Sequence, residues 1–358
     1  MKTLVVKIGT SSLVRGGHVD ESAIANLARQ VAVLREENWR TVVVTSGAIR
    51  LGLDTIGRAR AVRLPEKQAA AAIGQSLLMR AYRRAFETQS LPVAQLLLTR
   101  GDLSDRRRFL NARHTMTQLF RWNVVPIVNE NDTVAVDEIR VGDNDTLAAL
   151  TALVAEANLV LLLSDVDGFY LPGQKKPVAR IEKITEEIEA AAGGSGSIGG
   201  TGGMRTKVEA ARLATQSGIE LMIAHNKSED ALLRAARGEE FGTRFLAKAA
   251  LKGRKRWIAY GRTAQGTLLL NDNARGALVG KGSSLLPIGI TSVEGEFDAG
   301  ALVSVKDSGG EYARGLTNFS AEELRCIAGL HSSQISSALG RADFIEAIHR
   351  DNLIVTET

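Results

Sequence analysis

Over residues 1–240, compact apolar runs alternate with longer stretches in which apolar residues recur every three or four positions. Runs of five or six residues that are apolar throughout are typical of strands buried on both faces of a sheet. The spaced stretches have the period of a helix with one buried face. The expected strands are Leu4–Ile8, Thr41–Thr45, Val93–Leu98, Val124–Val128, Leu159–Leu163 and Glu220–Ala224. The expected helices are Ser22–Glu37, 47–54, 66–88, Arg106–Trp122, Thr146–Ala155 and Met204–Ser217.

This alternation predicts an α/β fold. Strands that are separated by helices pair as parallel neighbours, and the helices then cover both faces of the sheet. We therefore expect a three-layer αβα sandwich with a mostly parallel central sheet, formed by residues 1–250.

The pattern changes after about residue 245. A basic stretch leads into short segments that are separated by Gly, Asn and Asp, which is typical of a small β-rich domain. We expect a connector over 251–264 and a second domain over 265–358. Its expected segments are Thr267–Leu270, Ala277–Val279, Ile290–Val293, Leu302–Val305, Tyr312–Gly315 and a helix at Ala321–Leu330.

Cysteine content and hydropathy indicate in which cellular compartment the protein resides. The single cysteine, Cys326, has no partner for an intrachain disulfide, and its apolar helical surroundings predict a core position. No apolar stretch approaches the roughly 20 residues that a membrane helix needs. The N-terminus enters a strand directly, without a signal-peptide pattern. We therefore expect a cytoplasmic protein that does not contact a membrane.

Charge is divided unevenly between the two expected domains. The chain has a net charge of +5, but residues 265–358 hold seven Lys and Arg against twelve Asp and Glu. The first 264 residues therefore carry +10 and the remainder −5. A basic first domain favours an anionic substrate. An acidic second domain makes RNA binding doubtful.

Polar motifs follow several of the expected strands, at the edge where an open α/β sheet binds ligands. Lys7 and Gly9 end the first strand, and a lysine there is placed to meet an anion, although an edge lysine in solvent is the alternative. The other motifs are Thr45–Ile49, Asn129–Asp132, Val141–Asp145, Ser164–Gly168 and Thr201–Lys207. Each one alone fits a turn or a helix cap. Together, at successive strand ends, they predict one ligand site.

Other chemistries lack their motifs. The sequence contains no G-x-x-x-x-G-K-[ST] loop, no G-x-G-x-x-G after the first strand and no G-x-S-x-G elbow. Its five histidines show no metal-ligand spacing. The glycine-rich stretch 193–203 fits either a flexible spacer or a loop near a phosphate, and we favour the loop because a helix with Lys207 follows it directly.

In this order, the motifs resemble those of the amino acid kinase family, specifically the branch that phosphorylates glutamate and carries a C-terminal PUA domain. The resemblance covers nearly the whole chain. It rests on VVKIGTSS, VVTSGAI, NENDTVAVDEIRVGDND, LLLSDVDGFY and TGGMRTK, and on 254–257 and 281–287 for the second domain. Other branches usually begin Lys-x-Gly-Gly or Lys-x-Ser-Gly, and neither fits Lys7–Ser11. One departure is Ser164, where this branch usually has threonine; the hydroxyl is retained.

The resemblance implies the transfer of the ATP γ-phosphate to the γ-carboxylate of L-glutamate, the first step of proline biosynthesis. It implies catalytic roles for Lys7, Lys207, Asp145 and Asp165. It also implies two sets of binding residues. Those for glutamate are Ser46, Asp132, Asn144 and Asp143; those for ATP are Lys7, Ser164, Asp165, Thr201, Gly202, Gly203, Met204, Arg205, Thr206 and Lys207.

The resemblance also implies cofactors and partners. Mg²⁺ would be held mainly by the nucleotide phosphates, with no protein metal site. L-Proline would be a feedback inhibitor, the chain would form a homo-oligomer, and a glutamyl phosphate reductase would act downstream. Two alternatives remain: a kinase of the same fold with another carboxylate or a carbamate as acceptor, and an RNA-binding accessory protein that acts through the PUA domain.

Overall fold

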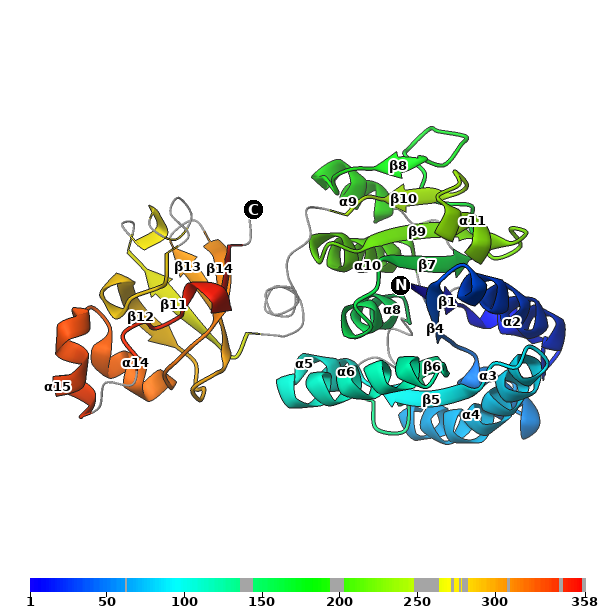
Figure 1. The fold of residues 1–358 in the computed structure, drawn as a ribbon, viewed down its shortest axis with the longest axis horizontal. Helices are drawn as coiled ribbons and strands as arrows, with labels where there is room; N and C mark the ends of the chain where they lie inside the picture. The colour runs from blue at the N-terminus through cyan, green and yellow to red at the C-terminus, as the bar shows by residue number, and fades with distance from the viewer. Residues whose placement is uncertain are drawn as a thin grey trace. The chain divides into compact units, whose positions relative to one another are not determined.

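The structure, a computed structural model, describes residues 1–355 except Val62, 136–143, 194–202, 248–263, 272–273, 277, 279–282, 308–309 and 341–343. The chain forms two compact units, Met1–Ala250 and Leu251–Thr358 (Figure 1). Each unit has its own hydrophobic core. Among the described residues, no helix combines the length and the apolarity that crossing a bilayer requires.

The first unit is built on an eight-stranded sheet. In spatial order the strands are β5 (Val93–Leu98), β6 (Val125–Glu130), β4 (Trp39–Val44), β1 (Lys2–Ile8), β7 (Leu159–Ser164), β9 (Glu220–His225), β10 (Thr243–Phe245) and β8 (Arg180–Ile181). The first six run parallel to one another, and β10 is antiparallel to β9. The mostly parallel sheet predicted from the sequence is thus confirmed.

Helices cover both faces of this sheet (Figure 1). One layer contains α2 (Glu21–Glu36), α3 (Ala48–Thr55), α4 (Leu64–Glu87) and α11 (Ala231–Arg237). The other contains α6 (Arg106–Arg121), α8 (Asn144–Val154) and α10 (Met204–Gln216). The remaining elements of the unit are α1 (Thr10–Leu13), the hairpin β2 (Val14–Arg15) and β3 (His18–Val19), α5 (Arg100–Ser104) and α9 (Glu186–Ala192).

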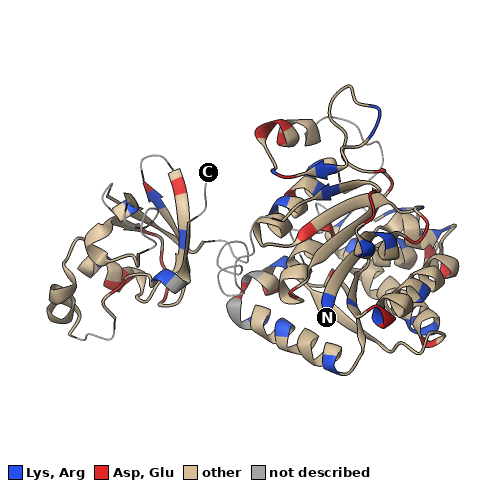
Figure 2. Cartoon of the chain, turned by 45° about the horizontal axis from the view of Figure 1, so that its top comes forward, with Lys and Arg blue, Asp and Glu red and all other residues tan. Residues whose placement is uncertain are grey.

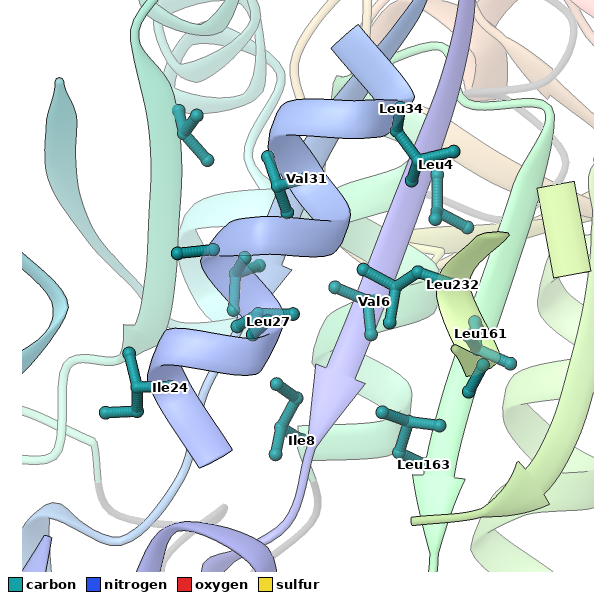
Figure 3. Packing of buried hydrophobic residues seen from close by; sticks show 14 of the residues in the cluster. Leu4, Val6, Ile8, Ile24, Leu27, Val31, Leu34, Leu161, Leu163 and Leu232 are labelled. Carbon is teal, nitrogen blue, oxygen red and sulfur yellow. The ribbon is translucent and has the colours of Figure 1, made fainter. Parts of the chain in front are cut away.

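The alternation of side chains along β1 explains how the core and a polar site share one strand. Leu4, Val6 and Ile8 point toward α2 and join the cluster that Figure 3 shows around Leu27. Since side chains of a strand alternate between faces, Lys7 points to the opposite face, which α8 covers. The strand is therefore anchored by the core on one face and presents a lysine on the other.

The strands and helices expected from apolar patterns all appear in this unit, with ends that differ by at most two residues from the prediction. The sequence did not reveal the short strands β2, β3, β8 and β10 or the helices α1, α5, α9 and α11. β8 has two residues and β10 has three, which is too short for a period to be recognised.

The second unit has a five-stranded sheet. In spatial order its strands are β12 (Ile290–Glu294), β11 (Gly266–Leu270), β13 (Leu302–Asp307), β14 (Gly310–Leu316) and β15 (Leu353–Val355). Its helices are η1 (Pro287–Gly289), α14 (Ala321–Ile327), η2 (Ser332–Gln334), α15 (Ile335–Leu339) and η3 (Arg350–Asn352). The expected segment Ala277–Val279 lies largely outside the described residues, as does the expected connector.

The predicted core position of Cys326 is wrong, because this side chain is exposed. Helix α14 buries Ala321, Leu324 and Ile327, which are spaced by three residues along the helix. Cys326 lies on the opposite side of the helix. Its apolar neighbours in the sequence therefore did not indicate a buried position for Cys326 itself.

Candidate active site

The sheet topology brings the sequence motifs to one edge of the sheet. β6, β4, β1 and β7 are consecutive neighbours and run parallel, so their carboxyl ends lie side by side. The residues that follow these ends are Asn131–Asp132, Thr45–Gly47, Gly9 and Asp165. Helix α8 begins at Asn144 over the same edge, since it packs against β1, β4 and β6.

One buried carboxylate joins two lysines at the centre of this edge. Lys7 Nζ lies 2.8 Å from Asp145 Oδ1, and Lys207 Nζ lies 3.0 Å from Asp145 Oδ2. The side chain of Asp145 is fully buried, whereas those of Lys7 and Lys207 are 13% and 6% exposed. The lysines come from a strand and a helix 200 residues apart, and the single aspartate fixes the spacing between their ammonium groups.

The two lysines keep this carboxylate ionised. Burial alone would raise the pKa of Asp145, but the charges of Lys7 and Lys207 and their hydrogen bonds outweigh it, and the pKa is lowered. The three side chains together carry one net positive charge. Thr206 Oγ1 also donates to Asp145 Oδ2, at 3.4 Å. A positive cluster of this kind, held rigidly in a low-dielectric setting, interacts strongly with an anion at the sheet edge.

The turn after β1 passes beside the first lysine. Gly9 lies directly after β1, and a Cβ atom there would lie 3.8 Å from Lys7 Nζ, so the turn passes close to the ammonium group. Lys207 stands in the first turns of α10, a 13-residue helix that begins after Gly203. The start of such a helix presents unpaired N–H groups and a partial positive charge.

A second cluster forms where β4 turns into α3. Gly47 has φ of +101°, which a residue with a side chain rarely adopts, and this turn aims Thr45 and Ser46 at α8. Asn144 Nδ2 lies 2.7 Å from Thr45 O and 2.6 Å from Ser46 Oγ. Because Asn144 and Asp145 are consecutive, the start of α8 connects this cluster to the paired lysines.

Two further residues of this cluster were not predicted as binding residues from the sequence. Asn129 Oδ1 lies 3.3 Å from Asn144 Nδ2, and Asn129 Nδ2 donates to Gln75 Oε1 at 2.8 Å. Asn129 is buried at the end of β6, and Gln75 belongs to α4. A buried amide in a parallel strand is a usable signal for Asn129; Gln75 has no comparable signal in its helical sequence.

Asp132 follows β6 and is partly buried. Burial raises the pKa of its carboxyl group to about 6. It is therefore ionised at pH 7 but sits in an environment that favours a cationic partner. This position suits an ammonium group.

The motif after β7 is more open. Ser164 is buried and its hydroxyl donates to Asp165 Oδ1 at 3.0 Å, while Asp165 itself is exposed. Since Ile8 pairs with Leu163, Ser164 lies beside the Gly9 turn. Gly203, Met204, Arg205 and Thr206 form the start of α10. Asp143, Thr201 and Gly202 lie outside the described residues, as does the glycine-rich stretch except Gly193 and Gly203.

Helix α6 is basic in sequence. All five of its charged residues are arginines, and Figure 2 shows basic and no acidic colour along it. The helix packs against β6 and α8, which both carry site residues. Arg108 and Arg113 are paired with Asp102 and Glu156.

Comparisons with known proteins agree with this geometry. Residues 2–225 match the amino acid kinase family, and residues 266–339 match the PUA domain. The chain therefore belongs to the amino acid kinase family and carries a PUA domain after the kinase domain.

The particular relatives are more specific. The chain is 45% identical to the glutamate 5-kinase of Carboxydothermus hydrogenoformans, over 100% of this chain and 98% of the relative. It is 46% identical to the glutamate 5-kinase of Syntrophotalea carbinolica, over 99% and 97%. Carbamate kinase from Giardia lamblia bound to AMP-PNP has the same fold, with a TM-score of 0.50 and 17% identity over 69% of this chain and 99% of that one.

Proposed function

We infer that this chain is an ATP-dependent kinase that phosphorylates the γ-carboxylate of L-glutamate, as the first step of proline biosynthesis. The observation that carries this conclusion is the similarity to glutamate 5-kinases along the full length of both chains. The acceptor alternatives, another carboxylate or a carbamate, have only a similarity of fold in their favour.

The reaction needs no general base, which fits a site built around two lysines. The γ-carboxylate of glutamate has a pKa near 4.3, so it is already ionised at pH 7 and attacks without losing a proton. Catalysis then depends on alignment and on neutralising charge on the moving phosphoryl group. We propose that Lys7 and Lys207 flank this group and that Asp145 holds them in place.

Glutamate and ATP are assigned to different parts of the site. We propose that Asp132 binds the α-ammonium group, because its carboxylate is partly buried and gains from a cation. Ser46 donates to a carboxylate oxygen of glutamate, the amide oxygen of Asn144 accepts from the same α-ammonium group, and Asp143 assists. Lys7, Ser164, Asp165 and residues 201–207 contact the nucleotide, and Asp165 organises its end of the site.

Kinase chemistry requires ATP, and we propose that Mg²⁺ accompanies it. Mg²⁺ in such sites usually takes one or two carboxylates together with substrate phosphates and water. The described residues contain no group of three or more His, Cys, Asp or Glu positioned for a metal. Asp145 is paired with two lysines, which leaves Asp165 as the exposed carboxylate at the nucleotide end. This donor set fits a metal held mainly by phosphates.

L-Proline is proposed as a feedback inhibitor, because it carries a positively charged α-nitrogen and an α-carboxylate, as glutamate does, and its nitrogen can bind Asp132. A homo-oligomer and a downstream glutamyl phosphate reductase remain predictions. RNA binding by the PUA domain remains doubtful on charge alone.

Trapping with hydroxylamine tests the reaction. An acyl phosphate reacts with hydroxylamine to give a hydroxamate, so the purified chain with ATP, Mg²⁺ and L-glutamate should form γ-glutamyl hydroxamate and ADP. Aspartate, N-acetylglutamate and carbamate serve as competing acceptors. ADP formation that is faster with any of these than with glutamate would contradict the proposal.

The pH dependence of glutamate binding is a second prediction. The free site has an Asp132 pKa of about 6, so the carboxylate is ionised above this pH and becomes protonated below it. The KM for glutamate should be constant from pH 7 to 8 and rise toward about tenfold per pH unit well below pH 6. Initial rates at pH 5–8 measure this.

The matched control is Asp132→Asn, which removes the titrating group and retains its shape. This variant should have a raised KM for glutamate that changes little between pH 5 and 8. A variant that keeps the wild-type pH profile would assign the titration to another group, such as the phosphates of ATP.

Removal of the second domain is a third prediction. All proposed site residues lie before residue 208, and the first unit has its own core. A chain ending at Tyr260 should therefore fold and retain glutamate kinase activity, while inhibition by proline or assembly can change. A folded but inactive truncated chain would show that the PUA domain contributes to catalysis.

A further inference from the structure

We propose that Gln75 of α4 is a positioning residue that fixes the orientation of the amides around the glutamate site. The proposal rests on the proposed function, because it assigns Asn144 and Ser46 to glutamate binding. Gln75 lies outside the edge of the sheet that holds the other site residues. It acts through Asn129 and does not contact the substrate itself.

Asn144, Asn129 and Gln75 form a chain of hydrogen-bonded amides. The backbone carbonyl at one end of it determines which atom of each amide donates. Thr45 O is a backbone carbonyl and can only accept, so the atom of Asn144 that lies 2.7 Å from it must be the NH₂ group. The same NH₂ group lies 3.3 Å from Asn129, which must then present its oxygen. Asn129 therefore directs its own NH₂ group at Gln75 and requires an acceptor there.

This orientation decides what the site offers a ligand. The NH₂ group of Asn144 has two hydrogens and three acceptors within 3.3 Å, namely Thr45 O, Ser46 Oγ and Asn129 Oδ1. Its hydrogens are therefore used within the protein. For the substrate, Asn144 offers its amide oxygen, which accepts from an ammonium group. Ser46 receives a hydrogen bond from Asn144, so its own hydroxyl proton is available for a carboxylate oxygen.

Gln75 completes the chain as an acceptor. Its oxygen takes the hydrogen bond from Asn129, whereas its own buried Nε2 has no partner among the described residues. A buried NH₂ group without a partner costs free energy. An apolar residue would avoid this cost but would leave Asn129 Nδ2 without its acceptor. Stability alone gives no reason for glutamine here, whereas positioning of Asn129 does.

The packing of α4 holds Gln75 in place. The preceding residue, Gly74, lies so close to α3 that a Cβ atom on it would be 1.8 Å from Ala48 O. About two helical turns further along, Tyr82 bonds to Thr45 through their hydroxyl groups at 2.9 Å. Helix α4 thus supports both the β4 turn and the end of β6.

The test is a double-mutant cycle on the full-length chain with Gln75→Leu, Asn129→Ala and both together. Gln75→Leu preserves approximate size and removes the acceptor. The KM for glutamate should rise about five- to tenfold, the size expected from one hydrogen bond, with kcat and the KM for ATP within about twofold. Because Gln75 acts through Asn129, the double variant should match Asn129→Ala alone.

Gln89→Leu is the control, since Gln89 is exposed just beyond α4. It should leave both KM values unchanged. If Asn129→Ala does not fold, Ser46→Ala takes its place in the cycle. A Gln75→Leu variant with an unchanged KM for glutamate, or effects that add fully in the double variant, would overturn the proposal. Equal rises in both KM values with a lower melting temperature would also overturn it, because they indicate a structural role. Failure of the proposed function is distinct: the wild-type chain itself would then form no hydroxamate.

Discussion

Replacement of Lys7 or Lys207 by alanine is expected to lower kcat by at least about 10²-fold, the effect of losing one preorganised charge donor at a transition state. The KM for glutamate should change much less, because the charge on the phosphoryl group develops during transfer. Each single variant should still fold. Asp145 retains one lysine partner at 2.8 or 3.0 Å, so the buried carboxylate is not left alone.

Lys2→Ala is a matched control, because Lys2 belongs to the same strand as Lys7 but is exposed at its other end. Its kcat should remain within about twofold of wild type. Hydroxamate formation measures kcat, and thermal unfolding shows that each variant is folded. A folded Lys7→Ala or Lys207→Ala variant with nearly normal kcat would disprove the assigned roles.

Replacement of Asp145 should affect stability more than replacement of either lysine. Asp145→Ala would leave two lysines close together in a largely buried site, and removing one partner of a buried ion pair typically costs about 3–5 kcal/mol. The three residues are therefore not equivalent for folding, although all three are proposed to serve the same step. Lysine variants test catalysis, whereas an aspartate variant tests catalysis and stability at once.

The sequence was sufficient for the parallel sheet and for the placement of several polar motifs along one edge of it. Fully apolar runs such as Leu159–Leu163 identify buried strands, and polar residues directly after such strands identify the ligand edge. The grouping of Lys7 with Asp145 and Lys207 was different. It came from resemblance, since no spacing in the sequence relates three residues so far apart.

The parts that could not be predicted depend on contacts between distant elements. Gln75 has an ordinary helical context, and its role appears only when α4 is placed against the end of β6. The orientation of the Asn144 amide is likewise determined by the fold, because its NH₂ group donates to a backbone carbonyl in the turn after β4. The sequence indicated Asn144 only as a glutamate-binding residue; its hydrogen bonds show which group of glutamate it suits, namely the ammonium group.

The close approach of α3 and α4 leads to a prediction about stability. Alanine is preferred over glycine inside a helix by about 1 kcal/mol, so Gly74→Ala would stabilise an isolated α4. In the protein, the added Cβ would lie 1.8 Å from Ala48 O and 2.7 Å from Gly52 N, which are both backbone atoms. A Cβ atom added to Gly52 would likewise lie 1.8 Å from Ala70 O. No side-chain rotation relieves these contacts, so the helices must separate.

We expect Gly74→Ala to lower the free energy of unfolding of the kinase domain by about 3 kcal/mol or more, at or above the usual cost of an overpacked core. The measurement is chemical denaturation followed by a probe of the first unit. Gly101→Ala is the control, since Gly101 also lies in a helix but its Cβ would meet only Thr99 Oγ1, at 3.5 Å. That variant should be neutral or slightly more stable.

Gly74→Ala should also change the geometry of the active site. Ala48 is the first residue of α3, directly after the turn that carries Ser46, and Gly74 precedes Gln75. Separation of the two helices would therefore move both ends of the amide network, and the KM for glutamate should rise in whatever fraction of Gly74→Ala remains folded. A Gly74→Ala variant as stable as wild type, with unchanged KM, would show that α3 and α4 can move apart without cost. Gln75 would then lack the rigid support on which its positioning role depends.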